Sequence, residues 1–518
     1  MKLFSLRLTT LKSKLYAIVF ASFVVRVVAF FLLPDKESNL APDEGNYGAL
    51  TEWIAQGKPA DEYEYNNLYL DSRTLIIPAS LLYRLSLSGL DSVRIISSIY
   101  GLLTFALIAF VLLRIFESRQ EAAIFFFKNQ KSVLILFAIF GFLPSHLIWS
   151  ILGLREAALE FWVLIVFSLI FYVFEVKKSP STKAFLGLLI AIPLVFSSRP
   201  QVGWVLGITL LIYFLFKVRF KAAQILIPLT VIGIISGYVV TTAFSVETVE
   251  VLVANKIIVS SSPSASSTSK QSPSSTVEPK PSKSGQAISS PTAISSPTAT
   301  TSAELEASRL CKSEGQEVSL RGSKYLCSKE VVKESIVGLE VVKKSIVGLK
   351  NPGVALVDQA DAIPVRNEGT KVGAASAIKT LSCPITSVSR FDKYFCIAYR
   401  APYTTFTFLF RPILGADVTS TSSLLAALEN TFWLTAFCFV AILFIRNRKV
   451  AFFETLVPSL IFFSIYAVGA GASEGNMGTA FRHKSLILWV VVLLIASTIV
   501  ATQQRKAEQQ GISGSSQE

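Results

Sequence analysis

Long apolar runs recur along this 518-residue chain, and they restrict its possible folds more than any other feature. The first run, LYAIVFASFVVRVVAFFLL at 15–33, is long enough to cross a bilayer core of roughly 30 Å. It is too long for a cleavable signal and no small-residue cleavage site follows it, so we expect it to remain as an anchor. Hydrophobic residues make up 52% of the chain and charged residues 16%, which indicates a polytopic membrane protein.

Ten of these runs are candidate membrane spans. They are 15–33, 92–113, 132–150, 156–174, 184–198, 201–216, 222–244, 424–444, 451–471 and 485–501. The runs 184–198 and 201–216 are shorter than the usual length of about 20 residues, so a hairpin that does not fully cross is an open alternative. The run 73–89 is amphipathic, and we expect it to lie along the outer membrane surface. The predicted fold class is an all-α polytopic membrane protein with about ten transmembrane helices.

Basic residues predict the orientation of these spans. Lysine and arginine cluster on alternate sides of the spans, in the segments 2–14, 114–131, 177–183, 217–221, 446–449 and 505–506. The positive-inside rule places these clusters and both termini in the cytoplasm, so we expect a multi-pass protein of the plasma (inner) membrane. Most of the net charge of +14 belongs to these segments, and the chain has no nucleic-acid motif. We therefore expect membrane lipid, and no nucleic acid, as a partner.

A large external loop separates two membrane parts. The predicted domains are an N-terminal membrane domain at 1–244 with a first external loop at 34–91, the large external loop at 245–423, C-terminal membrane helices at 424–501, and a cytoplasmic tail at 502–518. Residues 260–302 are rich in Ser, Thr and Pro and are predicted to be disordered. A stalk that carries O-linked sugars and a tolerated insertion are both open readings of this segment.

Cysteines support an external location for the large loop. Four of the five cysteines lie in it, and we expect a small disulfide-containing region at 303–400. Of the three possible pairings, we favour two local disulfides, Cys311–Cys327 and Cys383–Cys396. The loop lacks close C-x-x-C spacing and histidines, so no metal site is expected there, although a divalent ion elsewhere stays open.

The first external loop carries the leading catalytic candidates. In LAPDEGNYGALTEW at 40–53, Asp43 and Glu44 follow Pro42, which predicts a turn whose carboxylate can point back toward the spans. A solvated acidic loop is the alternative, because further acids follow at 61–71.

Three more polar clusters lie at the predicted outer ends of spans. Arg155 and Glu156 interrupt WSILGLREAALEFW, and Arg199 lies in SSRPQ. The stretch GASEGNMGTAFRHKSLILW contributes Glu474, Asn476, Arg482, His483 and Lys484. Each cation could be a snorkelling interfacial residue. Together with an acid, they suit a lipid-linked sugar phosphate, whose phosphate needs cationic partners and whose transfer to a hydroxyl needs a base.

These stretches resemble a known family. An acidic first external loop that opens with PDE soon after the first span resembles the C-type (GT-C) integral-membrane glycosyltransferases, which include protein mannosyltransferases and lipid A aminoarabinose transferases. PSHLIWSILGLREAA, the SRP turn, LFRPILG…LLAALENTFWL with Arg411, and GNMGTAFRHKSLILW resemble bacterial proteins of this kind. The resemblance covers about 1–244 and 400–501, and it implies that Asp43, with Glu44 as second choice, is the catalytic base. The Ser/Thr/Pro-rich insertion is not a family feature.

The predicted function is transfer of a hexosyl or pentosyl group from a polyprenyl-phosphate sugar to a glycan, lipid or protein acceptor of the cell envelope, without a cofactor. Arg155, Arg199, Arg482, His483 and Lys484 are the predicted donor-binding residues, and Glu156, Arg411, Glu474 and Asn476 are further candidates.

Two alternatives stay open. An O-antigen ligase or polymerase type of enzyme would concentrate its features in the late loop, which here is largely of low complexity. A polysaccharide flippase or transporter would place ionisable residues mid-span, where Arg26 and Glu160 are the interior charges of this sequence and suggest no relay.

Overall fold

The computed structural model of the protein describes most of the membrane part and two short strands. The described residues are 2–33, 41, 43–59, 68–69, 71–117, 130–177, 181–217, 221–243, 317–320, 323–326, 390–418, 420–446, 456–474 and 476–509. The chain divides into two compact units, Met1–Val251 with Ile363–Glu518, and Leu252–Ala362. The predicted disordered segment 260–302 lies outside the described residues.

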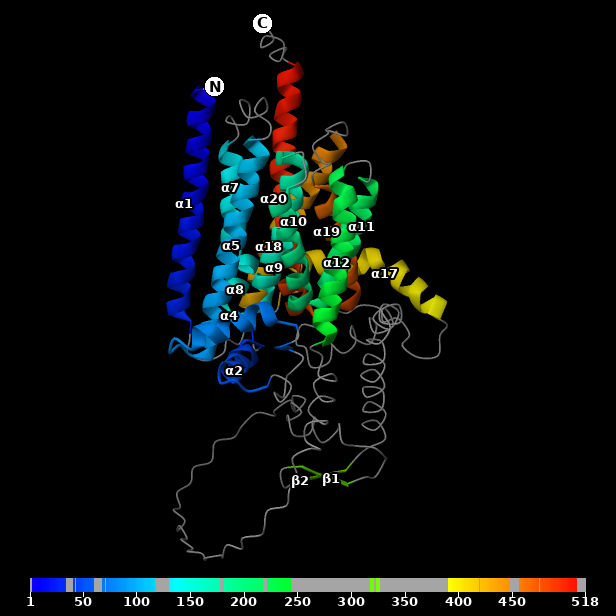
Figure 1. Ribbon diagram of the computed structural model, residues 1–518. Helices are drawn as coiled ribbons and strands as arrows, with labels where there is room; N and C mark the ends of the chain where they lie inside the picture. The colour runs from blue at the N-terminus through cyan, green and yellow to red at the C-terminus, as the bar shows by residue number, and fades with distance from the viewer. Residues whose placement is uncertain are drawn as a thin grey trace, which may run out of the picture. The chain divides into compact units, whose positions relative to one another are not determined.

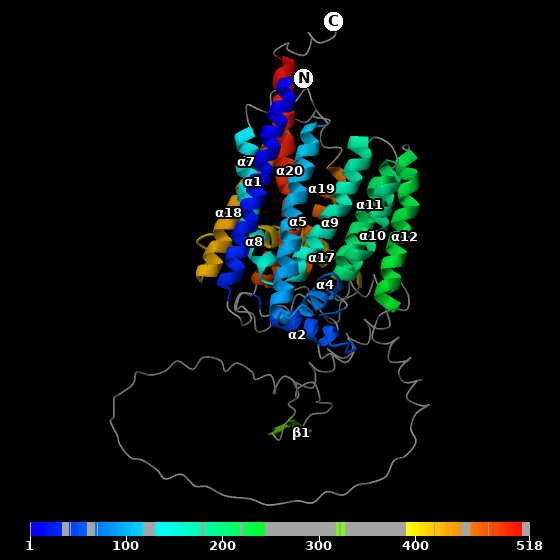
Figure 2. The same ribbon diagram turned by 60° about the vertical axis from the view of Figure 1, so that its left-hand side comes forward.

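The first unit is a helical bundle (Figure 1). Its N-terminal helices are α1 (Lys2–Leu32), α2 (Asp43–Ala55), α4 (Arg73–Tyr83), α5 (Gly89–Glu117), α7 (Gln130–Phe142), α8 (Pro144–Ile151), α9 (Arg155–Phe171) with the π-helical turn η2 (Tyr172–Lys177), α10 (Thr182–Ser198), α11 (Pro200–Phe216) and α12 (Lys221–Ala243). Its C-terminal helices are α17 (Arg390–Phe410), α18 (Thr421–Arg446), α19 (Val457–Ser473) and α20 (Met477–Gln509). In Figure 2, α10, α11 and α12 lie side by side at one edge.

Helix length and composition support the membrane assignment. Within the described residues, six helices are long and apolar enough to cross a membrane: Thr10–Leu32, Gly89–Ile115, Lys131–Ile151, Arg155–Phe174, Ser423–Ile442 and Met477–Ile499. The other four predicted spans are also helical but shorter in their described apolar parts; α10 and α11 have 17 residues each. A helix of that length is about 26 Å long, at the lower limit for a span. The predicted all-α polytopic fold is confirmed, and six of its ten spans reach full length.

Some boundaries differ from the sequence-based expectation. The run 132–150 is divided after Leu143, because Pro144 begins a new helix at the position where its missing N–H costs nothing. The last helix begins at Met477 instead of 485, so three predicted site residues lie within it. The helix α17 falls inside the range predicted as external loop, yet it packs against α19 of the bundle.

The helices alternate in direction, so the bundle has two distinct ends. Both termini lie at one end, and α2 and α4 lie at the other (Figure 1). Basic residues at helix ends, such as Arg114, Lys183 and Lys217, follow the alternation to the end that holds the termini. The opposite end, hereafter the α2 end, carries the start of α9, the α10–α11 turn and the start of α20.

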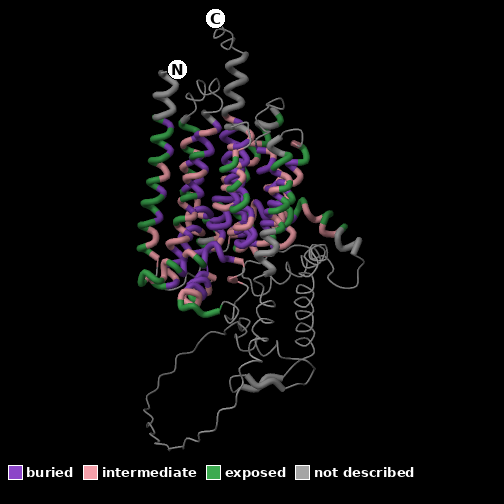
Figure 3. Tube along the Cα trace, viewed as in Figure 1, coloured by how far each residue is buried: buried purple, intermediate pink, exposed green. Residues whose placement is uncertain are grey.

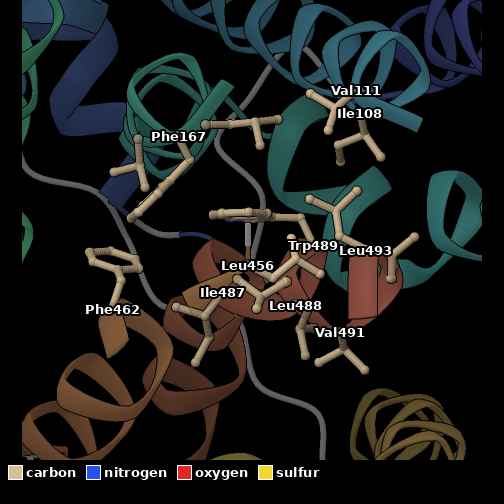
Figure 4. Packing of buried hydrophobic residues seen from close by; sticks show 14 of the residues in the cluster. Ile108, Val111, Phe167, Leu456, Phe462, Ile487, Leu488, Trp489, Val491 and Leu493 are labelled. Atoms are coloured by element: carbon tan, nitrogen blue, oxygen red, sulfur yellow. The ribbon is translucent and has the colours of Figure 1, made fainter. Parts of the chain in front are cut away.

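Apolar packing around α20 forms the core. In the apolar window of α20, 89% of residues are buried, against 17% in α1, so α20 is central and α1 peripheral (Figure 3). Trp489 of α20 is fully buried and lies among Phe167 of α9, Phe462 of α19 and Val111 of α5 (Figure 4). Burying such large side chains stabilises the arrangement of the helices that present the polar residues at the α2 end.

The second unit contains an antiparallel pair, β1 (Glu317–Leu320) and β2 (Ser323–Leu326), with Val318 opposite Tyr325. Sequence analysis did not predict these strands. Among the predicted disulfide partners, Cys396 is in a disulfide, whereas Cys311, Cys327 and Cys383 lie outside the described residues, so both pairings stay predictions.

Candidate functional site

Residues far apart in the sequence meet at the α2 end of the bundle. Asp43 is the first residue of α2, Arg155 begins α9, and Arg199 lies between α10 and α11. Arg482 and His483 lie in the second turn of α20. Each of these residues is at or near a helix end on the same side of the bundle (Figure 1). Their side chains therefore reach one another, as the contacts below show. We call Asp43, Glu156, Arg199, Glu474, Arg482 and His483, together with the Arg155–Asp71 pair, the outer cluster.

A turn at Gly153 positions Arg155 and Glu156 at the start of α9. Gly153, between α8 and α9, has a φ of +64°, which L side chains rarely adopt. A Cβ at this position would meet Val93 Cγ2 at 2.9 Å and the backbone nitrogen of Arg94 at 3.3 Å. The close turn therefore requires glycine, and it places Arg155 and Glu156 in the first turn of α9.

The two adjacent acids have different environments. The Asp43 side chain is 45% exposed, and its Oδ2 lies 2.8 Å from Arg482 Nη1. Glu44 is fully buried and accepts two hydrogen bonds from Arg94 of α5, at 2.8 Å from Nη2 and 3.3 Å from Nε. Both residues belong to the first turn of α2 instead of the turn predicted from Pro42. Glu44 thus holds α2 on α5, whereas Asp43 faces the aqueous side.

Arg482 joins the exposed acid to a buried one. Its Nε lies 3.2 Å from Glu156 Oε1, and the Glu156 side chain is only 4% exposed. Glu156 Oε1 is also 3.5 Å from His483 Nε2. Asp43, Arg482 and Glu156 therefore form a continuous path of alternating charge from solvent into the bundle.

His483 connects α20 with two other parts of the bundle. Its Nδ1 lies 2.8 Å from Glu474 Oε1 at the end of α19, and its Nε2 lies 2.7 Å from Arg199 Nη1. A guanidinium group can only donate, so Nε2 accepts the hydrogen bond from Arg199. The ring proton is then on Nδ1, which donates it to Glu474. This arrangement fixes a neutral tautomer of His483.

Two further residues, Arg155 and Tyr47, lie beside the acids of the outer cluster. Arg155 Nη1 lies 3.4 Å from Asp71 Oδ2 and 3.3 Å from the Asp71 carbonyl oxygen, to which it donates a hydrogen bond. Tyr47 of α2 is buried, and burial raises the pKa of its phenol although Arg155 opposes this shift. Tyr47 therefore stays protonated at neutral pH.

Several buried polar atoms of the outer cluster are not used in hydrogen bonds. Among the described residues, Arg155 Nε and Glu156 Oε2 have no hydrogen-bond partner, and Arg482 Nε and Glu156 Oε1 meet only as an ion pair at 3.2 Å. An unsatisfied buried polar group costs about 1–3 kcal/mol, so folded proteins rarely keep several together without a reason. The N–H group at Arg155 Nε, which has no partner in this cluster, is suited to binding an anionic ligand.

Besides Glu44, three predicted site residues do not join the outer cluster. Lys484 is fully buried, contacts Asn430 Oδ1 and the Leu409 carbonyl oxygen, and lies 4.5 Å from the centre of the Phe481 ring. Asn476 accepts a hydrogen bond from the Gly478 amide at the start of α20. Lys484 thus joins α20 to α17 and α18, and Asn476 caps the start of α20. Neither side chain contacts Asp43 in the described structure.

Arg411, the third, is engaged by Asp417. Arg411 Nε donates to Asp417 Oδ2 at 2.8 Å, and Asp417 also accepts from the Ile413 amide at 2.9 Å. The hydrogen bond from Arg411 lowers the pKa of Asp417, so this acid stays ionised at neutral pH. The pair fixes the turn between α17 and α18.

Sequence reasoning missed Arg94, Asp71 and Tyr47. Arg94 is a lone cation near the start of a long apolar run, and such a residue within a span signals a buried partner. Asp71 was grouped with the surface acids, and Tyr47 carried no recognisable signal. For metals, the described part of the chain contains no group of three or more His, Cys, Asp or Glu residues that could hold an ion.

Comparisons with known proteins do not assign this chain to a family. No protein-family model and no curated protein matches the chain. A solved structure that it resembles is the crystal structure of ArnT from Cupriavidus metallidurans in the apo state, at 14% identity and a TM-score of 0.33. That alignment covers 95% of this chain and 79% of ArnT. A TM-score of this size does not establish a shared fold.

Proposed function

We propose that this chain is a membrane glycosyltransferase that moves a sugar from a polyprenyl-phosphate donor to a cell-envelope acceptor. The α2 end of the bundle would face outward, because the basic helix ends lie on the opposite side with the termini, which fits the positive-inside rule. A donor of this kind keeps its tail in the bilayer and its phosphate at the surface, where the outer cluster lies.

Asp43 is the proposed base. It is the exposed member of the acid pair, and its contact with Arg482 orients the carboxylate. It is also the residue to which the family resemblance assigns this role. A positioned base of this type contributes about 100-fold to 10,000-fold to the rate.

Arg155, Arg199 and Arg482 are the proposed phosphate partners. In the structure they contact Asp71, His483, and Asp43 with Glu156, respectively. Binding the donor phosphate therefore means an exchange, in which guanidinium N–H groups turn from these partners to phosphate oxygens, while the N–H at Arg155 Nε can bind a phosphate oxygen directly. Withdrawal of Arg482 from Asp43 would free the carboxylate to accept a proton.

The proposed step is a displacement at the anomeric carbon. The acceptor hydroxyl gives its proton to Asp43 while its oxygen bonds to the anomeric carbon. The bond from that carbon to the phosphate oxygen breaks, and its electron pair leaves with polyprenyl phosphate. The arginines stabilise the negative charge that grows on this leaving group.

One observation carries the proposal: an exposed carboxylate is joined through Arg482 to a buried cluster in which the Arg155 Nε donor has no hydrogen-bond partner, at one end of a membrane bundle. The test uses purified protein in lipid bilayers, a panel of polyprenyl-phosphate hexoses and pentoses, and a cell-envelope extract as acceptor. We expect release of polyprenyl phosphate from at least one donor, dependent on the acceptor.

The same assay separates the alternatives. Diphosphate-linked glycans, tested in parallel, are the donors of a ligase or polymerase. Sealed vesicles report movement of an intact donor across the bilayer, which is the activity of a flippase. Cleavage of diphosphate donors alone, or movement without cleavage, would replace the proposed function.

A further inference from the structure

A second group of ionisable residues lies inside the bundle, apart from the outer cluster. Arg26 of α1, His146 of α8 and Glu160 of α9 are each only 2–3% exposed, and each lies within a membrane span. We call these three residues the inner cluster. Ionisable groups inside a membrane are costly and usually functional, and the proposed transfer reaction uses none of them.

The inner cluster lies next to the outer one along α9. Glu160 follows Glu156 by four residues, so the two side chains are one turn apart on the same helix face. His146 Nδ1 lies 3.5 Å from Glu160 Oε2, and the His146 ring stacks on Phe140 at 4.7 Å between ring centres. These contacts hold the imidazole and the carboxylate at a fixed position deeper in the bundle.

Arg26 balances the charge of Glu160 without touching it. Its Nε donates to Ser150 Oγ at 3.2 Å, and its Nη1 donates to Ser22. Arg26 and Glu160 interact electrostatically, but the described residues show no direct ion pair between them. With His146 neutral, the inner cluster therefore carries no net charge.

Each member of the inner cluster has one unused polar atom. Arg26 Nη2, His146 Nε2 and Glu160 Oε1 have no hydrogen-bond partner among the described residues. Buried groups of this kind are usually satisfied by bound water. A neutral imidazole whose Nδ1–H points to a carboxylate leaves Nε2 as a free acceptor, and that atom can take a proton.

We propose that the inner cluster is a hydrated proton-binding site inside the membrane, in which His146 Nε2 takes up the proton. Uptake converts the neutral imidazole to imidazolium, with its Nδ1–H directed at the Glu160 carboxylate and its new Nε2–H directed at water. The carboxylate favours this state, and the positive charge of Arg26 opposes it.

The other charged groups around His146 are already engaged. Glu429 of α18 accepts hydrogen bonds from the amide and hydroxyl of Ser145 and from Trp433 Nε1 at 3.1 Å. Lys484 of α20 contacts Asn430. On α5, which also packs against α8, Arg94 is paired with Glu44. Glu160 is thus the carboxylate whose removal should change proton binding at His146.

The composition of the chain makes this proposal directly measurable. The protein contains two histidines, so ¹⁵N-histidine labelling gives the signals of His146 and His483 alone, and the His483→Gln variant assigns them. Magnetic-resonance spectra of the protein in lipid, recorded between about pH 5 and pH 8, report the protonation state of each ring. Transfer of magnetisation from water reports hydration at His146 Nε2.

We expect His146 to pass reversibly from neutral to protonated within this range, with water contact at Nε2. In Glu160→Gln, the ratio of protonated to neutral His146 at a given pH should fall at least about tenfold, because the nearby anion is lost. The matched control is Glu429→Gln, which removes a carboxylate equally buried but directed at Ser145 and Trp433. It should lower the His146 ratio clearly less than Glu160→Gln does, since its carboxylate is hydrogen-bonded to Ser145 and Trp433 and does not face the imidazole.

A single protonation state of His146 across the range, or an unchanged ratio in Glu160→Gln, would overturn the proposal and leave the inner cluster as a static polar contact. If Glu160→Gln fails to fold, His146 titration in Arg26→Gln gives the second test, with an expected rise in the protonated fraction. None of these measurements needs glycosyl transfer, so their outcome is independent of the proposed function.

Discussion

Arg94 decides the roles of the two acids in the PDEGN stretch. It occupies both oxygens of Glu44 in a buried pair, while the neighbouring Asp43 is 45% exposed and contacts a single nitrogen of Arg482. A carboxylate held by two buried hydrogen bonds is poorly placed to take a proton from an entering hydroxyl. The sequence alone ranked Asp43 first through Pro42, whereas the structure adds a physical reason based on Arg94.

Neutralising a phosphate partner should weaken donor binding. Changing Arg155, Arg199 or Arg482 to Gln removes a charged hydrogen bond of about 1.5–3 kcal/mol, so donor affinity should fall roughly tenfold to hundredfold in titrations with a polyprenyl-phosphate sugar. Arg411→Gln is the control, because Arg411 pairs with Asp417 outside the outer cluster. Unchanged affinity and turnover in all three variants would mean that these arginines only anchor helix ends at the interface.

At the scale of elements, the crossing of α17 and α19 shapes one wall of the α2 end. Gly471 of α19 lies against the backbone of α17, and a Cβ there would meet the Thr404 carbonyl oxygen at 2.8 Å and the Thr405 nitrogen at 2.9 Å. These are backbone atoms, which cannot move away by a change of rotamer, so a Cβ at Gly471 would require the two helices to shift. Because α19 ends at Ser473, just before Glu474, this crossing also positions the partner of His483.

Gly471→Ala should therefore separate the two helices. We expect a loss of about 1–3 kcal/mol in stability from overpacking, seen as a lower thermal unfolding midpoint in lipid or detergent. Gly469→Ala in the same helix is the matched control, because a Cβ at Gly469 meets nothing within 4 Å and alanine favours helix. Equal stability of the two variants would show that the helices can shift apart without cost.

Hydropathy predicted the helices better than their ends. Each of the ten predicted spans contains a helix in its described residues, because an apolar run in a bilayer must satisfy its own backbone. The start of α20 was placed at 485 because FRHK interrupts the apolar pattern, yet Arg482 and His483 pair with Asp43, Glu156 and Glu474. Lys484 is buried against α17 and α18. The amphipathic helix α17 was missed because its pattern of polar and aromatic residues is typical of neither a span nor a loop.

At the scale of the whole molecule, the alternating direction of the helices determines which connecting segments lie on the same side of the membrane. Lys58, in the segment after α2, and Lys183, at the start of α10, lie at opposite ends of the bundle. With the proposed orientation, Lys58→Cys should react with an impermeant thiol reagent in intact cells, whereas Lys183→Cys should react only after permeabilisation. The reverse pattern would place the outer cluster in the cytoplasm and contradict an external acceptor.

The assembly of the site could be predicted only in part at this scale. Sequence placed Asp43, Arg155, Arg199 and Arg482 on one side through topology alone, and the structure brings these four positions together at the α2 end. The sequence could not show that Arg482 pairs with Asp43, 439 residues away. It also could not show that Lys484 lies outside the outer cluster while its neighbour His483 belongs to it. Such pairings depend on how helices are rotated, which hydropathy does not report.

The most direct test of the central proposal compares Asp43→Asn with Glu44→Gln in the polyprenyl-phosphate release assay, alongside donor binding and thermal stability. If Asp43 is the base, Asp43→Asn should lower turnover by about 100-fold to 10,000-fold with donor binding nearly retained. Glu44→Gln should instead lower stability by about 3–5 kcal/mol, because Arg94 loses its buried partner, while its folded fraction keeps turnover within about tenfold. Normal turnover of Asp43→Asn, or a larger loss of turnover in folded Glu44→Gln, would contradict the assignment of Asp43 as the catalytic base.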